Sequence, residues 1–407
     1  MNIPDFPSDL RMRESYTKRV EPFIRKQIVK VFTGQRRVGK SFILYQIMQM
    51  IANKDPQASI IYINKEDHRF DSILAYDDLI RFVESARDNN KVNYIFIDEI
   101  QEISEFEKAI RSLLLDRKND LYITGSNAQI FSGEIATLLG GRLVEFNIHS
   151  LSYSEFLFFH GMEDTRESLG KYFFLGGMPF LVNLGLDDKV ATEYLKNLYT
   201  TIVYREIVAR NRVRSTWFLE QLIRYLADTT GSLFSAKSIS DYLKSQKIKI
   251  SHNQVQSFIG YMSDAYLVHR VPRYDIAGKR LFETGEKYYF EDLGLRNSLT
   301  GYRPGDLGKI LENAVHNELL FRGYMVKTGW KGNHETDFIA TKDNETAYIQ
   351  VAWTLDSEST IDREFGNLLE IDDNYPKMVV TADEQFINTI KGVRHVNIRQ
   401  FLTSNII

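Results

Sequence analysis

The sequence predicts an α/β fold in which the first 150 residues form a parallel sheet covered by helices. Short apolar, β-branched runs alternate there with longer segments of helical periodicity. These runs are nearly continuously apolar, which is typical of strands covered on both faces. They are IVKVFTG (28–34), SIIYINK (59–65), NYIFIDE (93–99), DLYITGS (120–126) and LVEFNI (143–148). The segments between them are long enough for the crossover helices that a parallel sheet requires.

Length and composition exclude several classes of protein. A chain of 407 residues holds two or three domains at about 150 residues per domain. With 43% hydrophobic and 26% charged residues it is neither a disordered tail protein, a collagen-like fibre nor a coiled-coil rod. The chain has no cysteine, which excludes disulfides, thiolate chemistry and cysteine-ligated metal sites.

Net charge and hydropathy patterning bear on partners and location. The formal net charge of −3 argues against a uniformly basic nucleic-acid coat but leaves room for a local basic patch. The N-terminal segment MNIPDFPSDLRMRES lacks the pattern of a signal peptide. No apolar run approaches the roughly 18 residues of a membrane-spanning helix. We therefore expect a soluble, cytoplasmic protein without a membrane partner.

The pattern changes after Ser150 and predicts three further regions. Residues 165–230 look mainly helical, with a turn at LGGMP (175–179). From 231 to 290, two helix candidates and a hairpin with IAG at its turn follow in an order that resembles a winged helix. Beyond Gly305, a helix, three strands, a charged helix and the strand KMVVTA predict a smaller α/β unit. The predicted domains are 1–150, the sheet core; 151–215, a helical lid; 216–300, the winged helix; and 301–407, the small α/β domain.

A phosphate-binding loop is the most specific motif in the chain. Residues 34–41 match G-x-x-x-x-G-K-[ST], directly after a strand and before an amphipathic helix. The glycines allow backbone N–H groups to wrap phosphates, Lys40 neutralises the β- and γ-phosphates, and Ser41 binds Mg²⁺. The helix that begins at Lys40 also directs its positive end at the same anion. The predicted nucleotide-binding residues are Gly34, Gln35, Arg36, Arg37, Val38, Gly39, Lys40 and Ser41, with ATP and Mg²⁺ as cofactors.

Polar residues after later strands complete the predicted nucleotide site. Asp98 ends an apolar strand 58 residues after Lys40 and is expected to reach the Mg²⁺ shell, and Glu99 to polarise the attacking water. Asn127, in TGSN after the next strand, is expected to orient that water or the γ-phosphate, although turn chemistry also explains it. Arg142, in LLGGRLVEF, is expected to act in trans on a neighbouring subunit's γ-phosphate, with a surface salt bridge as the alternative.

These motifs together resemble the AAA+ branch of the P-loop ATPases. The set GQRRVGKS, FIDEIQ, TGSN, GGR followed by LSYSEF, and LGGMP is similar to a prokaryotic ATPase family that pairs an AAA-type domain with a C-terminal DUF4143-type region. The resemblance implies ATP binding and hydrolysis and a tendency to form a ring, here expected as a hexameric-type homo-oligomer. It also suggests that Arg205, in VYREIVAR, is a lid arginine that senses the nucleotide. An ordinary helix-surface arginine is the alternative.

The last region resembles the PD-(D/E)xK nuclease fold, in which carboxylates hold Mg²⁺ and a lysine helps to activate water. Glu312 and Asp337 match the first two acidic positions. At the E-x-K position this chain reads Gln350-Val351-Ala352, so the expected lysine is missing. We therefore predict a nuclease-like domain that no longer cuts, and that binds DNA or a partner or contributes to assembly. An ordinary small α/β domain remains an alternative.

The predicted winged helix carries a local excess of positive charge. Residues 205–287 contain fourteen Lys and Arg against eight Asp and Glu, a balance of +6. Lys244, Lys247 and Lys249 precede the predicted recognition helix, and Lys279 and Arg280 lie at the predicted wing. These five residues are the predicted DNA contacts. A basic protein-binding surface or a packing module is the alternative.

Three functions follow from these features. The first is an ATP-driven oligomeric ring that binds and remodels or translocates DNA, including branched DNA. The second is an ATP-dependent signalling or assembly switch that binds a protein partner, with which the 22 Tyr and 26 Phe are compatible. The third is an ATP-dependent nuclease, against which Gln350 and Ala352 count.

Overall fold

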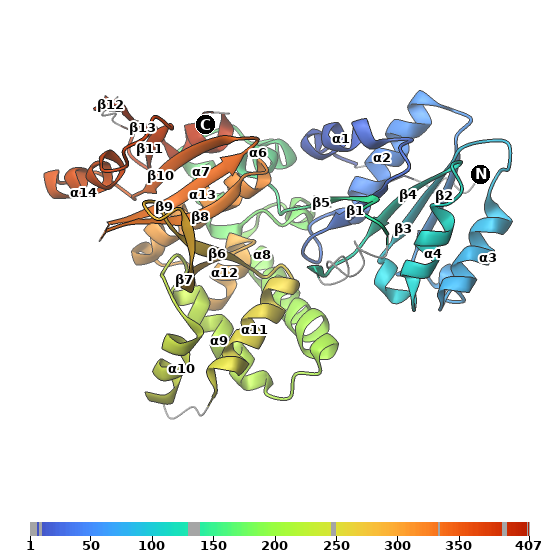
Figure 1. Ribbon diagram of the computed structural model, residues 1–407, viewed down its shortest axis with the longest axis horizontal. Helices are drawn as coiled ribbons and strands as arrows, with labels where there is room; N and C mark the ends of the chain where they lie inside the picture. The colour runs from blue at the N-terminus through green and yellow to red at the C-terminus, as the bar shows by residue number, and fades with distance from the viewer. Residues whose placement is uncertain are drawn as a thin grey trace. The chain divides into compact units, whose positions relative to one another are not determined.

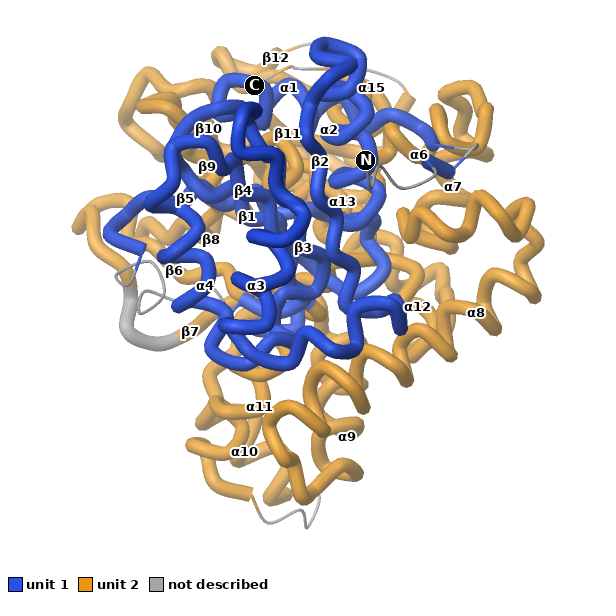
Figure 2. The backbone as a smooth tube through the Cα atoms, turned by 90° about the vertical axis from the view of Figure 1, so that its right-hand side faces the viewer, with its two compact units in different colours: residues 1–149, 264–266 blue, residues 150–263, 267–407 orange. Residues whose placement is uncertain are grey.

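The computed structural model describes residues 6–7, 10–128, 139–245, 250–332, 334–384, 389–404 and 406. They form two compact units (Figure 2). The first unit comprises Met1–His149 and Asp264–Tyr266, and the second Ser150–Ser263 and Leu267–Ile407.

The first unit is an α/β domain built on a parallel five-stranded sheet, as the sequence predicts (Figure 1). The order of the strands is β2-β3-β4-β1-β5, and every neighbouring pair is parallel. Each strand lies within the apolar run that predicts it, apart from one added residue at the start of β4. The strands are β1 (Val29–Thr33), β2 (Ser59–Asn64), β3 (Asn93–Asp98), β4 (Asn119–Thr124) and β5 (Leu143–Asn147).

Helices cover this sheet and account for the continuous apolar character of its strands. Side chains of α3 and α4, such as Leu79 and Ile110, pack in one buried cluster with Val31 and Ile95 of the sheet. Burial of this apolar surface stabilises the sheet by roughly 25 cal/mol per Å² removed from water. The helices are α1 (Glu14–Val20), α2 (Lys40–Lys54), α3 (Tyr76–Ala86) and α4 (Phe106–Leu113), with short 3₁₀ turns at Glu21–Phe23, His68–Phe70 and Ile100–Glu102.

The second unit is organised around an eight-stranded mixed sheet with the order β12-β13-β11-β10-β9-β8-β6-β7. Its strands are β6 (Val268–Asp275), β7 (Arg280–Phe290), β8 (Met325–Lys331), β9 (His334–Lys342), β10 (Glu345–Val351), β11 (Lys377–Thr381), β12 (Thr389–Ile390) and β13 (Val393–Asn397). The hairpin β6–β7 joins this sheet because β6 pairs with β8 in parallel over Arg273–Asp275. Apart from Asp264–Tyr266, one unit therefore spans the segments 151–215, 216–300 and 301–407.

Helices pack on both sides of this sheet. Residues of α6, α7, α13 and α15 share one large buried cluster with the strands, and residues of α14 share a separate one. The helices are α6 (Tyr153–His160), α7 (Arg166–Leu175), α8 (Asp188–Thr201), α9 (Thr216–Asp228), α10 (Ala236–Ser245), α11 (His252–Asp264), α12 (Leu293–Thr300), α13 (Leu307–Phe321), α14 (Glu358–Leu369) and α15 (Ile398–Thr403). A π-helix, Ile202–Ala209, continues α8, and 3₁₀ turns lie at Pro179–Leu184 and Pro304–Asp306.

Local sequence signals explain how the second unit begins. Ser152 and Glu155 form a capping box at the start of α6, in which each side chain accepts from the other residue's backbone N–H. The turn predicted at LGGMP follows α7, where a Cβ at Gly177 would lie 2.3 Å from the carbonyl oxygen of Leu151. Only glycine fits that close approach.

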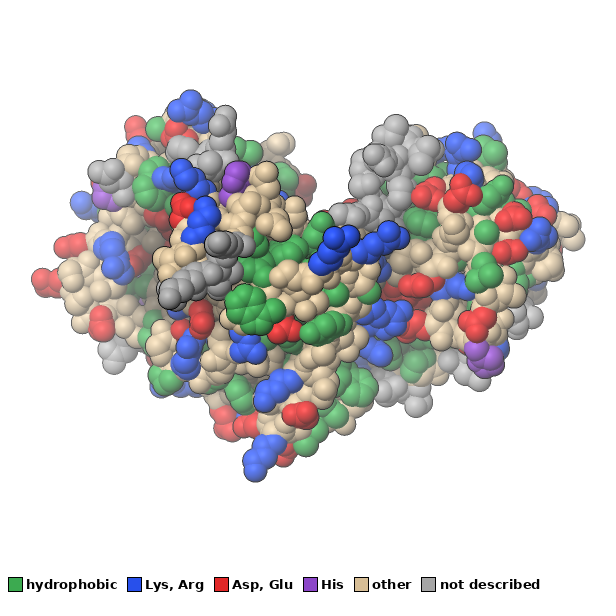
Figure 3. Space-filling view, turned by 90° about the horizontal axis from the view of Figure 1, so that it is seen from below, with side chains coloured by type: hydrophobic (Ala, Val, Ile, Leu, Met, Phe, Trp, Pro, Cys, Tyr) green, Lys and Arg blue, Asp and Glu red, His purple; other side chains and the backbone are tan. Residues whose placement is uncertain are grey.

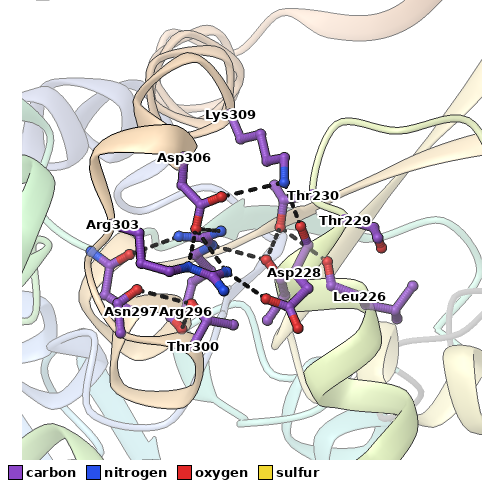
Figure 4. A network of polar contacts seen from close by, with 12 residues as sticks. Leu226, Asp228, Thr229, Thr230, Arg296, Asn297, Thr300, Arg303, Asp306 and Lys309 are labelled. Atoms are coloured by element: carbon purple, nitrogen blue, oxygen red, sulfur yellow. Dashed lines mark hydrogen bonds and ion pairs between the residues drawn. The ribbon is translucent and has the colours of Figure 1, made fainter.

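A buried polar network ties α9, α12 and the start of α13 together (Figure 4). The guanidinium of Arg296, 1% exposed, donates to the carbonyl of Ala227 at 2.9 Å and to Asp306 at 3.0 Å. Arg303 also pairs with Asp306, at 2.9 Å. Because each buried charge has a partner, the network fixes how these helices pack without leaving an unpaired ion inside.

In the described part of the chain, the helices are too short or too polar for any of them to traverse a lipid bilayer.

Candidate functional site

The loop between β1 and α2 needs glycine at its first position. Gly34 has a φ of +139°, and a Cβ there would lie 2.1 Å from the carbonyl oxygen of Ile148. Gly39, the residue before α2, has a φ of +97°. Both values lie in the region that residues with a side chain rarely adopt. The loop can therefore turn tightly between β1 and the N-terminus of α2, where backbone N–H groups remain available to an anion.

Lys40 is buried and holds its ammonium inside this loop. Its Nζ donates to the backbone carbonyls of Gly34 and Gln35, at 3.1 Å each. The same Nζ lies 3.9 Å from Oε1 of Glu99. Two of its partners are neutral carbonyl groups, so a phosphate is a stronger partner for this ammonium than its present ones.

The other residues of the loop differ in exposure. Gln35 and Val38 are fully buried, whereas Arg37 is exposed and has a left-handed backbone with φ +71°. Arg36 is 8% exposed and forms an ion pair with Glu66 at 2.8 Å. Arg36 and Lys40 are thus the two buried cations of the loop.

Asp98 is the last residue of β3, and its buried carboxylate is surrounded by hydroxyl groups. Its carboxylate accepts hydrogen bonds from the hydroxyls of Thr124 (2.5 Å), Tyr62 (3.2 Å) and Ser41. Burial raises the pKa of Asp98 above its ordinary value, partly opposed by the hydrogen bonds from Ser41 and Thr124. A carboxylate and a hydroxyl that face each other are oxygen ligands of the kind Mg²⁺ prefers, so this pair fits that ion.

Glu99 follows Asp98 and takes a left-handed backbone with φ +56°. Burial acts to raise the pKa of Glu99, but the ammonium of Lys40 and a hydrogen bond from Gln101 hold it below its ordinary value. The hydroxyl of Ser126 also bonds to this carboxylate. Glu99 is therefore ionised at neutral pH, as a group that polarises water must be.

Strand β4 lies between β1 and β3 and connects the two halves of the site. Thr124, its last residue, donates to Asp98 and accepts from the backbone N–H of Glu99 at 2.8 Å. Ser126 and Asn127 follow it and are 1% and 2% exposed. The carboxyl ends of parallel strands meet at one sheet edge, so Lys40, Asp98, Glu99 and Asn127 lie at the same edge.

Arg142 lies at the opposite edge of the sheet. It precedes β5, which is parallel to β1, and β5 spans about 16 Å at about 3.3 Å per residue. Its Nε donates to the carbonyl of Leu139 at 3.3 Å, and its side chain is half-buried. The fold thus keeps Arg142 away from the loop between β1 and α2 of the same chain.

The residues predicted to contact DNA fall into three groups in the second unit. Lys244 pairs with Asp241 at 3.3 Å, and Arg280 lies 3.7 Å from Asp275. Lys279 forms no ion pair with a carboxylate among the described residues and lines a hollow together with Lys327 and Lys331. Lys247 and Lys249 lie outside the described residues. Arg205 is exposed on the π-helix of the same unit.

The three predicted residues of the nuclease-like site do come together. Glu312 lies on α13, Asp337 on β9 and Gln350 on β10. Oε1 of Gln350 accepts from the backbone N–H of Asp337 at 3.3 Å. A lysine is present after all, because Nζ of Lys287 on β7 lies 2.8 Å from Glu312 and 3.0 Å from Asp337.

The match to a known domain family falls mainly on the first unit. Residues 26–157 match the AAA domain family. An uncharacterized protein of Haemophilus influenzae is 33% identical over 396 residues, which cover 96% of this chain and 98% of that protein. Residues 26–157 therefore carry an AAA domain, and the chain belongs to one family with this relative. A second relative, an uncharacterized protein of Methanocaldococcus jannaschii, is 30% identical over 379 residues, 88% of this chain and 83% of that protein.

A solved structure shares the fold of this chain. The Walker-type ATPase of Pyrococcus abyssi superposes with a TM-score of 0.52 at 15% identity, covering 74% of this chain and 99% of that chain. Residues 166–306 match a domain of unknown function, DUF8612. The DUF4143-type assignment expected from the sequence is therefore not confirmed.

Several residues of these sites have no local signal in the sequence. Thr124 and Tyr62 contact Asp98 from neighbouring strands, and Gln101 contacts Glu99. Thr124 is the first residue of TGSN. The motif indicates a polar turn after the strand, but it does not indicate that Thr124 faces Asp98 and Glu99. Lys287 directly precedes the apolar run Tyr288-Tyr289-Phe290, but this local pattern does not indicate which carboxylates the lysine meets.

We expect Thr124→Val to lower ATP turnover by about 10- to 100-fold, the usual effect of removing a partner of a metal ligand. Valine keeps the volume but neither donates to Asp98 nor accepts from Glu99. The matched control is Thr328→Val, because the buried hydroxyl of Thr328 has no hydrogen-bond partner among the described residues. Phosphate release at saturating ATP and Mg²⁺ measures the effect. Wild-type turnover in folded Thr124→Val would show that this hydroxyl does not position Asp98.

Proposed function

We propose that the chain is a Mg²⁺-dependent ATPase that works as an oligomer and acts on DNA. The observation that carries the ATPase part is the buried junction of Ser41, Asp98, Thr124 and Glu99 beside Lys40. Ser41 and Asp98 would hold Mg²⁺, which neutralises phosphate charge when bound. Lys40 exchanges its two backbone carbonyls for the β- and γ-phosphates of ATP.

Glu99 is the group that acts on water in this proposal. Its carboxylate is ionised and is fixed by Gln101, Ser126 and the Lys40 ammonium. It orients a water molecule in line with the γ-phosphate and accepts a proton from that water as the new P–O bond forms. The bond between the γ-phosphorus and the β–γ bridging oxygen breaks in the same step, and ADP leaves. Asn127, buried at the same edge, orients the water or the γ-phosphate.

The place of Arg142 supports an oligomer. The arginine lies at the sheet edge opposite its own nucleotide loop, so it serves a nucleotide only if that nucleotide belongs to another subunit. A guanidinium supplied in trans stabilises charge on the transferred phosphoryl group. We infer a homo-oligomer, a ring of hexameric type, in which each site is completed by its neighbour. Arg205 would sense the nucleotide from the lid segment.

We expect Arg142→Ala and Lys40→Ala each to lower turnover by about a thousandfold or more, as loss of such groups does. A mixture of the two variants should regain turnover, because Lys40 of one chain and Arg142 of the other then form a complete site. Lys40→Ala mixed with the double variant is the matched control and should stay inactive. Wild-type turnover in Arg142→Ala alone, or an inactive mixture, would contradict action in trans.

For DNA, a lysine-lined hollow in the second unit supports a contact that includes the predicted wing residue Lys279. Lys279, Lys327 and Lys331 line a hollow of about 520 Å³ beside the sheet of the second unit, and none of them forms an ion pair with a described carboxylate. Tyr274 and Tyr375 line the same hollow, and Tyr375 is 47% exposed. Lysines bind backbone phosphates and exposed aromatic rings stack on bases.

The hollow is not uniformly basic. Asp372 and Asp373 also line it, although Asp373 is engaged by Lys377 at 3.0 Å and by the hydroxyl of Tyr348 at 2.7 Å. Figure 3 likewise shows basic and acidic side chains interspersed on one face. We therefore expect a local DNA contact. Binding should release only a few counterions, so DNA affinity should depend only moderately on salt.

We expect replacement of Lys279, Lys327 and Lys331 by Gln to weaken DNA binding. The slope of log affinity against log salt should fall by about 2 to 3, close to 0.9 per phosphate contact. Replacing the exposed Lys189, Lys196 and Lys391 by Gln changes the net charge equally and is the matched control. Fluorescence anisotropy with linear and branched duplexes, at several salt concentrations, measures the DNA affinity of both triple variants.

Equal slopes for the two triple variants would overturn this DNA surface. An absence of DNA binding at low salt, with and without an ATP analogue, would favour the alternative of an ATP-dependent switch that binds a protein partner. The strongly exposed Trp217 and Phe158, 57% and 62% exposed, are apolar anchors available for such a partner.

A further inference from the structure

The acidic centre of the second unit contains a buried ammonium. Lys287 is 3% exposed, and its Nζ lies 2.7 Å from Glu335, 2.8 Å from Glu312 and 3.0 Å from Asp337. A lysine ammonium has three donors, and three carboxylates surround it here. Its hydrogen-bonding capacity is therefore filled by this centre.

Lys287 reaches the centre from a different part of the chain than its partners. It lies on β7, an edge strand of the sheet, whereas Glu312 lies on α13 and Asp337 on β9. Among the described residues, β6 pairs with β8 over Arg273–Asp275, and the pairing of β6 with β7 shifts register between Pro272 and Tyr274. Such irregularities bend strands, which allows a β7 side chain to lie over β9.

The charge of Lys287 is fixed by its partners. Burial alone would lower the pKa of Lys287, but Asp337 and Glu312 raise it well above its ordinary value. The ammonium is therefore present at every physiological pH. Burial also raises the pKa of Glu312, to about 7, in spite of the attraction of Lys287. The centre thus holds one constant positive charge among several acidic groups.

Three carboxylate oxygens of Glu312 and Asp337 already accept hydrogen bonds. Oε1 of Glu312 accepts from Lys287 and from the hydroxyl of Tyr289 at 2.6 Å. Oδ1 of Asp337 accepts from Lys287, and its Oδ2 accepts from the backbone N–H of Val351 at 2.9 Å. These contacts orient both carboxylates toward the ammonium and the backbone.

The arrangement does not fit the divalent ion that the nuclease fold implies. Mg²⁺ requires several oxygen atoms at about 2.0 to 2.1 Å. In the described part of the chain, no three acidic residues of this centre bring their ligand atoms within 4.8 Å of one another. The neutral amide of Gln350 stands where the PD-(D/E)xK nuclease pattern has a carboxylate. The Lys287 ammonium lies among the oxygen atoms that a metal ion would need.

We propose that the Lys287 ammonium is the resident cation of this centre, in place of a divalent metal ion. The centre is then metal-independent and does not hydrolyse phosphodiesters. Its carboxylates instead fasten the hairpin β6–β7 to α13 and β9. The inference concerns the second unit alone and is independent of the ATPase and DNA proposals.

Replacement of Lys287 by Met tests the proposal, because it removes the charge at similar length. Without the ammonium, the carboxylates repel one another and leave room for a divalent ion. We expect Lys287→Met to unfold at a lower temperature than wild type, to gain about one bound Mn²⁺ per chain, and to be stabilised by Mn²⁺. The double variant Lys287→Met/Asp337→Asn should lose that ion and the stabilisation.

A matched control is Lys377→Met, which removes another largely buried lysine of the same unit from its partner Asp373. It should gain no Mn²⁺. Mn²⁺ binding is followed by electron paramagnetic resonance on nucleotide-free protein, where the ATP site is the same in all variants. A folded Lys287→Met that gains no ion would overturn the proposal.

A second comparison needs no Lys287 variant, in case that variant fails to fold. Wild type and Asp337→Asn should bind the same amount of Mn²⁺, and wild type should leave supercoiled plasmid intact in Mg²⁺ or Mn²⁺. One additional Mn²⁺ in wild type would overturn the proposal. Nicking that Asp337→Asn removes would do the same, and would establish the nuclease alternative.

Discussion

The hydroxyl of Thr124 is the contact on which the nucleotide site depends. It donates to Asp98 and accepts from the backbone N–H of Glu99, so one side chain fixes both acidic residues. It can do so because β4 lies between β1 and β3 in the sheet. The strand order thus places the end of β4 between the phosphate loop, which follows β1, and the acidic pair, which follows β3.

Two buried lysines serve opposite purposes in the two units. Lys40 donates to two backbone carbonyls and lies 3.9 Å from its nearest ionic partner, so it can transfer to a phosphate. Lys287 is held by three carboxylates within 3.0 Å, so its exchange for another ion would leave buried charges unpaired. The number and charge of the partners separate a ligand-binding lysine from a structural one.

The sequence predicted the parallel sheet and the phosphate loop because both depend on local patterns. Continuous apolar runs located all five strands of the first unit, and glycine spacing located Lys40 and Ser41. Thr124 and Tyr62 could not be assigned, since their roles depend on which strands are neighbours. Lys287 was missed for the same reason, because it lies far along the chain from Gln350 and meets its partners through an irregular sheet. The pairing of the hairpin with β8 is likewise a long-range contact without a local signal.

The central claim is that Glu99, held ionised by Lys40 and Gln101, acts on water beside a nucleotide bound at Lys40. Measuring ATP affinity and single-turnover hydrolysis of Glu99→Gln tests it most directly, with the exposed Glu105→Gln as control. We predict ATP affinity close to that of wild type and hydrolysis slower by about 100-fold or more, the usual range for a lost general base. Hydrolysis within a factor of about two of wild type in folded Glu99→Gln would contradict the claim.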